Sequence, residues 1–443
     1  MAVQFARFGN GTLPFRVASR VNYENFYRGE CQMNSVELFA GAGGLGMGLS
    51  LAGFEAQAVV EWDKGACDTV RENISRGFPY VAGWPIWEGD VRAWIEEFCG
   101  SGQRSEIALV GGGPPCQPFS MGGKHAAFSD ARDMFPISVD VVRRLHPRAF
   151  IFENVKGLTR SSFHNYYQYI LLQLEFPEIR RKVDQSWKEH AERLQRYKSS
   201  RRGASSSGLE YNVFPTLVNA ANYGVPQRRE RVFIVGFRKD LDVRWRFPWE
   251  SHSLDALLFD QWVTGSYWER HQIAKTRRPN IPVAMKSVVD RMGGLAIEPT
   301  KLPWRTVRDA LVGLPDPTTT CSESSVNLNH RLQSGAKSYA GHTGSPLDLP
   351  AKTLKAGDHG VPGGENMLVN PDGSVRYFTV RESARLQTFP DGFYFHGSWT
   401  ETMRQLGNAV PVLLARTVAA SVAEKLHEYA AKNTVPQTKK VMS

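Results

Sequence analysis

The sequence is poor in cysteine and lacks any long hydrophobic run. Its five cysteines are an odd number without a C-x-x-C pair or an accompanying histidine cluster, which makes a disulfide framework or a zinc site improbable. No run of about 18 apolar residues occurs, and the N-terminus lacks the apolar core of a signal peptide. We therefore expect a protein without a metal site or a membrane span, in a reducing, cytoplasmic setting.

Acidic side chains are in the minority. The chain has 44 Asp and Glu against 54 Lys and Arg, which gives a formal net charge of +10. This surplus is spread over 443 residues, and it favours a polyanionic partner such as nucleic acid over acidic small molecules. The length suits two domains, and a hydrophobic content of 42% is enough for a sizeable core.

The first half of the chain alternates short apolar segments with helical patterns. This alternation predicts parallel β-α-β units and therefore an α/β, Rossmann-like domain. Expected strands are 36–39, 58–60, a short one just before Asp90, 107–110 and 149–152, and expected helices are 47–52, 67–75 and 137–145. Strand patterns resume at 214–218 and 231–235.

The rest of the chain is less regular. A stretch rich in Trp, Arg, Gly and Pro has poor periodicity and predicts a second, smaller, irregular domain, whereas an amphipathic helix at 410–432 should return to the first domain. The predicted division is an N-terminal extension at 1–33, a catalytic domain at 34–240 with a basic, Ser-rich insertion at about 180–210, the irregular domain at 241–378, a C-terminal segment at 379–432 and a tail at 433–443.

A glycine turn follows the first predicted strand. Gly41 to Gly46 satisfies G-x-G-x-x-G, in which glycines let a ligand approach the backbone and a helix N-terminus offers free N–H groups. Glu61, at the end of the next strand, could accept both hydroxyls of a ribose, and Asp90 could receive an adenine amino group. Alone, this pattern fits NAD and S-adenosylmethionine equally, and it could also be a turn that merely packs.

A stiff turn follows the strand at 107–110. The sequence Gly-Pro-Pro-Cys-Gln-Pro-Phe-Ser at 113–120 fixes the backbone on both sides of Cys116, at the strand edge where open α/β sheets bind ligands. Most cysteines are small buried hydrophobes without chemistry. The rigid setting makes Cys116 a candidate nucleophile.

Three more polar blocks lie at the ends of predicted strands or at the start of the last helix. Glu153-Asn154-Val155 stands just past the strand at 149–152, Gln227–Arg231 precedes another strand, and Gln405–Pro411 opens the last helix. Each could be a cap, an ion pair or a solvated charge run when taken singly. Their occurrence in this order, together with both turns, is improbable by chance.

At these positions the chain resembles the DNA (cytosine-5) methyltransferases of bacterial restriction-modification systems. The resemblance implies a Rossmann-like, S-adenosylmethionine-dependent methyltransferase domain with a target-recognition domain at 241–378. The matching blocks are 39–46, 61–63, 89–91, 115–117, 153–155, 227–231, 381–390 and 407–410.

The resemblance also implies a mechanism. Cytosine C5 becomes nucleophilic once a thiolate, here Cys116, adds to C6, and Glu153 would act as general acid at N3. Arg231 would hold the cytosine O2, and Arg229 would support the intermediate or Glu153. The target base must be flipped out of the duplex. Gln117, Ser120 and Lys124 are the implied DNA contacts.

The family also implies how the cofactor, S-adenosyl-L-methionine, is bound. The implied contacts are Phe39, Gly41, Gly43, Glu61, Trp62, Asp90, Val91, Pro115, Phe135, Asn408 and Val410.

Other interpretations stay open at the level of sequence. A nicotinamide oxidoreductase would explain the glycine turn but leaves the Cys, Glu-Asn-Val and Q-x-R-x-R blocks without a role. A tRNA cytosine-5 methyltransferase shares the chemistry but has little room for a recognition domain. In this chain roughly 150 residues separate the Q-x-R-x-R block from the block at 381–390. The expected partner is therefore double-stranded DNA, bound by a monomer, with a cognate restriction endonuclease acting separately.

Overall fold

The computed structural model describes residues 33–100, 106–115, 133–200, 208–295, 298–317, 328–339, 343–356 and 364–434. The predicted roles of Cys116, Gln117, Ser120 and Lys124 therefore lie outside the described residues, as do nearly all of the N-terminal extension and the tail.

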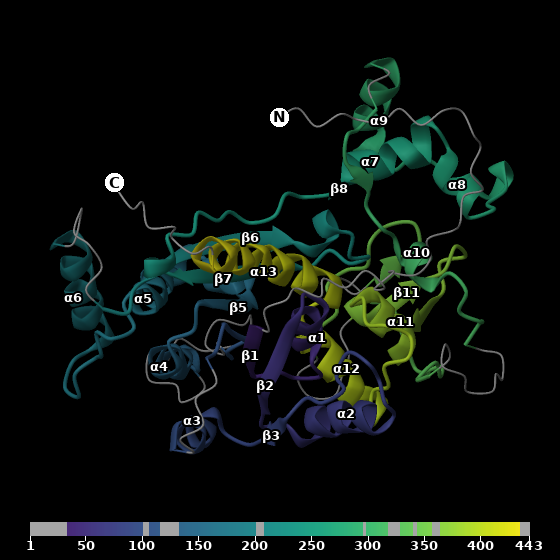
Figure 1. Ribbon diagram of the computed structural model, residues 1–443. Coiled ribbons are helices and arrows are strands. Elements are labelled where there is room, and N and C mark those ends of the chain that lie inside the picture. Colours follow the sequence, from purple (N-terminus) through teal and green to yellow (C-terminus); the bar gives the residue numbers. More distant parts are fainter. Residues whose placement is uncertain are drawn as a thin grey trace, which may run out of the picture.

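A seven-stranded sheet forms the centre of the protein (Figure 1). Its strands are β1 (Met33–Leu38), β2 (Phe54–Glu61), β3 (Ile86–Glu88), β4 (Leu109–Gly112), β5 (Ala149–Val155), β6 (Tyr211–Asn219) and β7 (Glu230–Arg238). They lie in the order β3-β2-β1-β4-β5-β7-β6. The first five run parallel, and β7 runs antiparallel to both of its neighbours. The α/β, Rossmann-like class predicted from the alternation is confirmed.

The structure corrects one strand boundary that matters for the site. Glu153 was expected just past its strand, but it lies inside β5. The antiparallel partner β7 is the reason, because it pairs Glu153 with Phe233 and extends the ladder to Val155 opposite Arg231. Glu153 is therefore held by its pairing with β7 rather than by a loop, although the parallel ladder between β4 and β5 ends one residue earlier, at Phe152.

Helices cover both faces of the sheet. On one face α3, α4, α5 and α6 pack on apolar side chains of β1, β2, β4 and β5, and on the other α1 and α13 pack on β4, β5 and β7. The helices of this part are α1 (Gly44–Leu51), α2 (Lys64–Ser75), α3 (Val91–Gly100), α4 (Phe135–Leu145), α5 (His164–Glu175), α6 (Trp187–Ser200), α11 (Val380–Leu386), α12 (Trp399–Asn408) and α13 (Val412–Thr434).

The last helix returns to the sheet as the sequence predicts, and Figure 1 shows it lying across β6 and β7. Its buried stripe includes Leu414, Val418, Val422 and Leu426. The stretch 399–433 is long and apolar enough to cross a membrane by length and composition, but 67% of its most apolar window is buried inside the protein. This burial is typical of the core helix of a globular domain.

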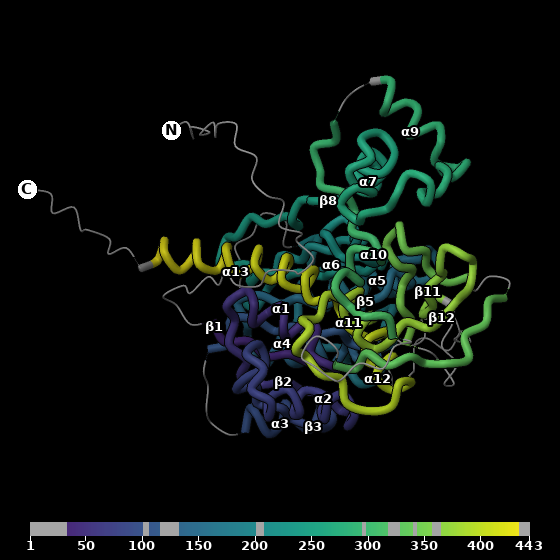
Figure 2. The backbone as a smooth tube through the Cα atoms, turned by 90° about the vertical axis from the view of Figure 1, so that its right-hand side faces the viewer, coloured from purple at the N-terminus to yellow at the C-terminus, as the bar shows by residue number. Residues whose placement is uncertain are grey.

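We use the name recognition region for residues 241–378, the predicted target-recognition domain. Its strands have two or three residues, and its α-helices have five, apart from α9 with 13. They are α7 (Leu254–Leu258), α8 (Ser266–Arg270), α9 (Val283–Leu295), α10 (Val307–Leu311), β8 (His252–Ser253), β9 (Leu302–Pro303), β10 (Ser345–Pro346), β11 (Met367–Val369) and β12 (Val375–Tyr377). In both views α7 and α9 stand apart from the sheet (Figures 1 and 2).

The outer and inner parts of the recognition region belong to two different hydrophobic cores. Its outer part has a small core of its own around Leu257, Tyr267 and Trp268. Its inner part, including Val307 and Leu354, shares a core with the glycine turn and the C-terminal segment. The predicted domain division at 240 and 378 stays a prediction.

Candidate active site

One cavity of about 710 Å³ gathers residues from most of the predicted blocks. It lies at the carboxyl edge of the parallel strands, where the chain leaves β1 and β4. From β1 the chain continues to β2 on one side of the sheet, and from β4 it continues to β5 on the other side. Open α/β sheets bind ligands at such a point, where the strand order reverses. The predicted site residues that line the cavity are Phe39, Gly41, Glu61, Trp62, Asp90, Val91, Pro115, Glu153, Arg231, Asn408 and Val410.

The glycine turn bends sharply between β1 and α1. Phe39 and Gly41 both have left-handed backbones, with φ of 56° and 55°, and Gly43 caps α1 with φ of 83°. Phe39 and Gly41 line the cavity, but Gly43 does not. A Cβ at Gly43 would lie 2.8 Å from the Trp84 ring, so this glycine allows the close packing that shapes the turn.

Glu61 ties the glycine turn to the end of β2. Its carboxylate accepts backbone N–H groups from Gly41 at 2.7 Å, Trp62 at 2.9 Å and Asp63 at 2.8 Å. Burial raises the pKa of Glu61, and these hydrogen bonds oppose the shift. The neighbouring Trp62 is 73% exposed at the cavity wall, where its ring is free to stack on a ligand.

The cavity is also lined by residues 113–115, which we call the proline turn. Asn154 donates its side-chain N–H to the Pro114 carbonyl at 2.8 Å, and the Met134 N–H donates to the Pro115 carbonyl at 3.1 Å. The last two described residues before Cys116 are therefore both anchored to neighbouring elements. Asn154 thus has a clear local role, which is to hold the turn that leads to the candidate nucleophile.

Glu153 and Arg231 form an ion pair in the cavity wall. The Arg231 Nε lies 2.7 Å from the Glu153 Oε1, and the two side chains are 11% and 8% exposed. They meet because Glu153 pairs with Phe233 and Arg231 lies two residues away on the same face of β7. Burial lowers the pKa of Arg231, and Glu153 opposes that shift. A cation and a carboxyl group are thus held together beside the proline turn.

Comparison with known sequences identifies the class of protein. The sequence model of a family described as C-5 cytosine-specific DNA methylase matches residues 33–178 and 204–424. The chain belongs to this family.

Individual relatives and a solved structure agree with the assignment. The chain is 28% identical over 418 residues to Type II methyltransferase M.AplI of Arthrospira platensis, covering 92% of each chain. It is 30% identical over 401 residues to Type II methyltransferase M.XorII of Xanthomonas oryzae pv. oryzae, covering 89% of this chain and 85% of the relative. A prophage-encoded DNA modification methyltransferase structure from E. coli matches with a TM-score of 0.52 at 21% identity, covering 89% of this chain and all of that one, which supports the fold.

Besides Gly43, two predicted site residues of this DNA methylase do not line the cavity. Phe135 opens α4 and is fully buried in the core between that helix and the sheet, so the structure does not place its ring in the cavity wall, and its contact with the cofactor stays a prediction. Arg229 is also fully buried, and its guanidinium donates to main-chain carbonyls rather than to Glu153. The described structure therefore gives Arg229 main-chain partners, and its support of the intermediate or of Glu153 stays a prediction.

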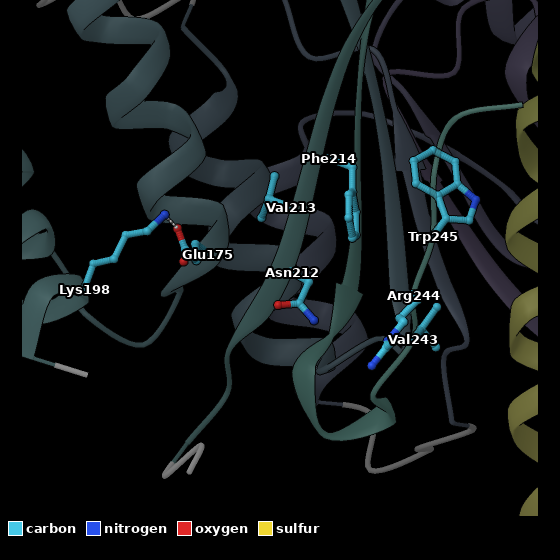
Figure 3. Close-up of a pocket in the computed structure, with 8 residues that line it drawn as sticks. All are labelled: Glu175, Lys198, Asn212, Val213, Phe214, Val243, Arg244 and Trp245. Atoms are coloured by element: carbon cyan, nitrogen blue, oxygen red, sulfur yellow. Dashed lines mark hydrogen bonds and ion pairs between the residues drawn. The ribbon is translucent and has the colours of Figure 1, made fainter. Parts of the chain in front are cut away.

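A second cavity, of about 440 Å³, lies at the edge strand β6 (Figure 3). It straddles the strand, with Glu175 and Lys198 on one side and Val243 to Trp245 on the other. None of the predicted site residues lines it. It therefore carries no part of the proposed chemistry.

Sequence reasoning missed one acid in the methylase cavity. Glu37 lies in β1 within the sequence Val-Glu-Leu-Phe, and an acid in an otherwise apolar strand was the available signal. Its Oε1 accepts the Gly46 N–H at 2.8 Å, whereas its buried Oε2 has no hydrogen-bond partner in the described structure. Burial raises the pKa of Glu37 to about 8. The acid is thus held neutral near pH 7 with one oxygen free for a ligand.

The raised pKa predicts how stability depends on pH. Folded protein keeps the Glu37 proton between about pH 4.5 and 8, whereas unfolded protein loses it, so this group's contribution to stability falls as pH rises through that range. Glu37→Gln mimics the neutral acid and should flatten the decline. We expect the Tm of the variant minus the Tm of the wild type to increase from pH 5 to pH 8.

The matched control for this measurement is Glu97→Gln, at an exposed carboxyl group on α3. Thermal unfolding without ligands should give this control the wild-type pH profile. If Glu37→Gln also follows the wild-type profile, the buried acid does not titrate as proposed.

Proposed function

We propose that this methylase transfers the methyl group of S-adenosyl-L-methionine to C5 of a flipped-out cytosine in a specific duplex DNA sequence. The reaction would pass through a covalent bond between Cys116 and cytosine C6. One observation carries the proposal: the Glu153–Arg231 pair and the proline turn line the same cavity as Glu61 and Trp62. A methyl donor and a pyrimidine would therefore meet in one enclosed space.

The described residues fit this methyl donor. Glu61 offers a carboxylate for ribose hydroxyls, and Trp62 offers an exposed ring for adenine. The Glu37 Oε2, which has no hydrogen-bond partner among the described residues, can form a hydrogen bond with the amino-acid end of the molecule, and Asn408 and Val410 line the same cavity. When bound, the donor supplies an electrophilic methyl group on a sulfonium sulfur. The fit is one of chemical type, with an acceptor for the ribose and a ring for the adenine.

The chain's own residues would then act on the cytosine. The Cys116 thiolate forms a bond to C6, the π electrons of the C5–C6 bond move into a C4–C5 double bond, and those of the N3–C4 bond take a proton from Glu153 at N3. Carbon C5 would then form a bond to the methyl carbon of the donor as the methyl–sulfur bond breaks and its electron pair stays on sulfur. A base removes the C5 proton, the C5–C6 double bond forms again as the Cys116 thiolate leaves, and N3 returns its proton to Glu153. Proton transfer by a positioned group such as Glu153 typically contributes about 10²–10⁴-fold to rate. Arg231 holds the carboxyl group in place and provides positive charge beside the ring.

The relatives suggest the biological setting. Because curated relatives are named Type II methyltransferases, we infer that methylation protects host DNA against a separate cognate restriction endonuclease. The enzyme would act as a cytoplasmic monomer at the nucleoid, with the recognition region reading the target sequence. A tRNA substrate is the second candidate, and family membership gives no support to a nicotinamide oxidoreductase.

Bisulfite sequencing tests the activity and the target together. DNA from a host that lacks cytosine methylation should, after expression of this protein, retain unconverted cytosines at one short recurring sequence. DNA from the same host expressing Cys116→Ser serves as the control and should convert completely. Complete conversion with the wild-type protein would refute DNA methylation, and protected cytosines in tRNA alone would favour the second candidate.

A further inference from the structure

Arg229 joins the cofactor side of the cavity to the recognition region. Its side chain is fully buried, and its Nη1 donates to the Leu354 carbonyl at 3.1 Å. Its Nη2 donates to the carbonyls of Gly407 at 2.8 Å and Ala409 at 2.9 Å. Leu354 belongs to the recognition region, whereas the other two residues flank Asn408 in the cavity wall. One guanidinium thus bridges two segments far apart in sequence.

The two segments also touch each other directly. A Cβ at Gly407 would lie 2.2 Å from the Ala356 nitrogen and 2.4 Å from the Lys355 carbonyl carbon, so the backbones are in contact there. Gln227, from the same Q-x-R-x-R block, accepts the Leu354 N–H at 3.0 Å. The segment 353–356 is therefore fixed to the start of β7 on one side and to the cavity wall on the other.

Because Arg229 is buried, its hydrogen bonds are sensitive to movement of either segment that it binds. It forms no ion pair with any residue that the structure describes, and its Nε has no hydrogen-bond partner there. Burial lowers the pKa of Arg229, the nearby Arg231 lowers it further, and the charge of Glu153, which is not hydrogen-bonded to it, opposes the shift. A buried cation without a carboxylate depends on the hydrogen bonds that it does make. Displacing either segment alone would remove acceptors from it, so the two segments should move together.

We propose that Arg229 is a positioning residue that couples the cofactor pocket to the recognition region, so that cofactor and duplex DNA bind with positive cooperativity. Ligand contact at Asn408 would hold the Gly407 and Ala409 carbonyls, and through Arg229 it would also hold 353–356. Reciprocal linkage then requires DNA to tighten cofactor binding by the same factor. This inference rests on the proposed function, because it takes both ligands from it.

The coupling is measured as a ratio of affinities. The dissociation constant of the wild-type protein for a duplex containing its target is determined with and without S-adenosyl-L-homocysteine, the demethylated product. We expect this product to tighten DNA binding within the range of about 5–150-fold that is typical of coupled sites. Arg229→Lys loses the planar fork that reaches three carbonyls, and its ratio should fall towards 1.

Arg381→Lys is the matched control. Arg381 is also fully buried and donates to three main-chain carbonyls, those of Leu328, Pro390 and Phe393, but none of these three residues lines the cavity, whereas Gly407 and Ala409 do. Both variants should lower Tm, yet only Arg229→Lys should lose the coupling ratio. A wild-type ratio in Arg229→Lys, or an equal loss in Arg381→Lys, would overturn the proposal.

Hydrogen exchange on the wild-type protein provides a readout that does not depend on a stable variant. S-adenosyl-L-homocysteine alone, without DNA, should slow amide exchange in both 405–410 and 353–356. Protection confined to 405–410 would overturn the coupling but leave the proposed function intact. A wild-type protein that binds no S-adenosyl-L-homocysteine would instead refute the proposed function and this inference with it.

Discussion

Replacing the candidate nucleophile, in Cys116→Ser, should abolish methyl transfer while cofactor binding persists. A serine hydroxyl is scarcely ionised near neutral pH, whereas a thiol with a pKa near 8.5 is readily activated by nearby cations or a helix end. Without addition to C6 the C5 carbon stays too weak a nucleophile to accept the methyl group. We expect a loss on the order of 10⁴-fold or more in turnover, measured as transfer of a tritiated methyl group to duplex DNA.

Cys99→Ser is the control for this variant. Cys99 is partly buried on α3 and does not line the active-site cavity. It should keep wild-type turnover, and calorimetry should give both variants the wild-type affinity for S-adenosyl-L-homocysteine. Substantial turnover by Cys116→Ser would remove this residue from the mechanism.

Glu153→Gln should lower turnover by about 10²–10⁴-fold, which corresponds to roughly 3–5 kcal/mol of barrier. The amide has nearly the same shape as the acid and can still meet Arg231, but it cannot give a proton to N3. Single-turnover kinetics isolate the chemical step, because product release does not contribute to them. The loss should therefore appear in the methyl-transfer rate rather than in the affinity for either ligand.

Glu230→Gln provides a neighbouring comparison. Glu230 lies next to Arg231 on β7, but its carboxylate is exposed and forms an ion pair with Lys156 outside the cavity. It should keep a rate close to that of the wild type. Equal rates for Glu153→Gln and the wild type would exclude Glu153 as the proton donor.

The sequence predicted the parts of the site that depend on local signals. Glycines after an apolar strand, an acid at the end of the next strand and prolines before Cys116 each restrict the backbone within a few residues. Glu61 and Pro115 accordingly line the cavity where they were expected. The helix at 412–434 was also predictable, because its apolar spacing at Leu414, Val418 and Val422 is continuous.

The failures arise where long-range packing decides. The antiparallel course of β7 carries no local signal, yet it extends β5 past Glu153 and brings Arg231 to it. Motif membership likewise did not distinguish Arg231, which lines the cavity, from Arg229, whose partners lie more than 100 residues away in the chain. Phe135 was assigned from the family resemblance at a position outside the matching blocks, and its ring lies in the core beneath α4.

The most direct measurement of the central claim is a covalent trap. Duplex DNA with 5-fluorocytosine at the target position is incubated with the wild-type protein and S-adenosyl-L-methionine, denatured and analysed by peptide mass spectrometry. Because fluorine cannot leave C5 as a proton does, the account predicts a stable adduct on the peptide containing Cys116, carrying one transferred methyl group. No adduct from protein that methylates ordinary cytosine, or an adduct on any other residue, would contradict it.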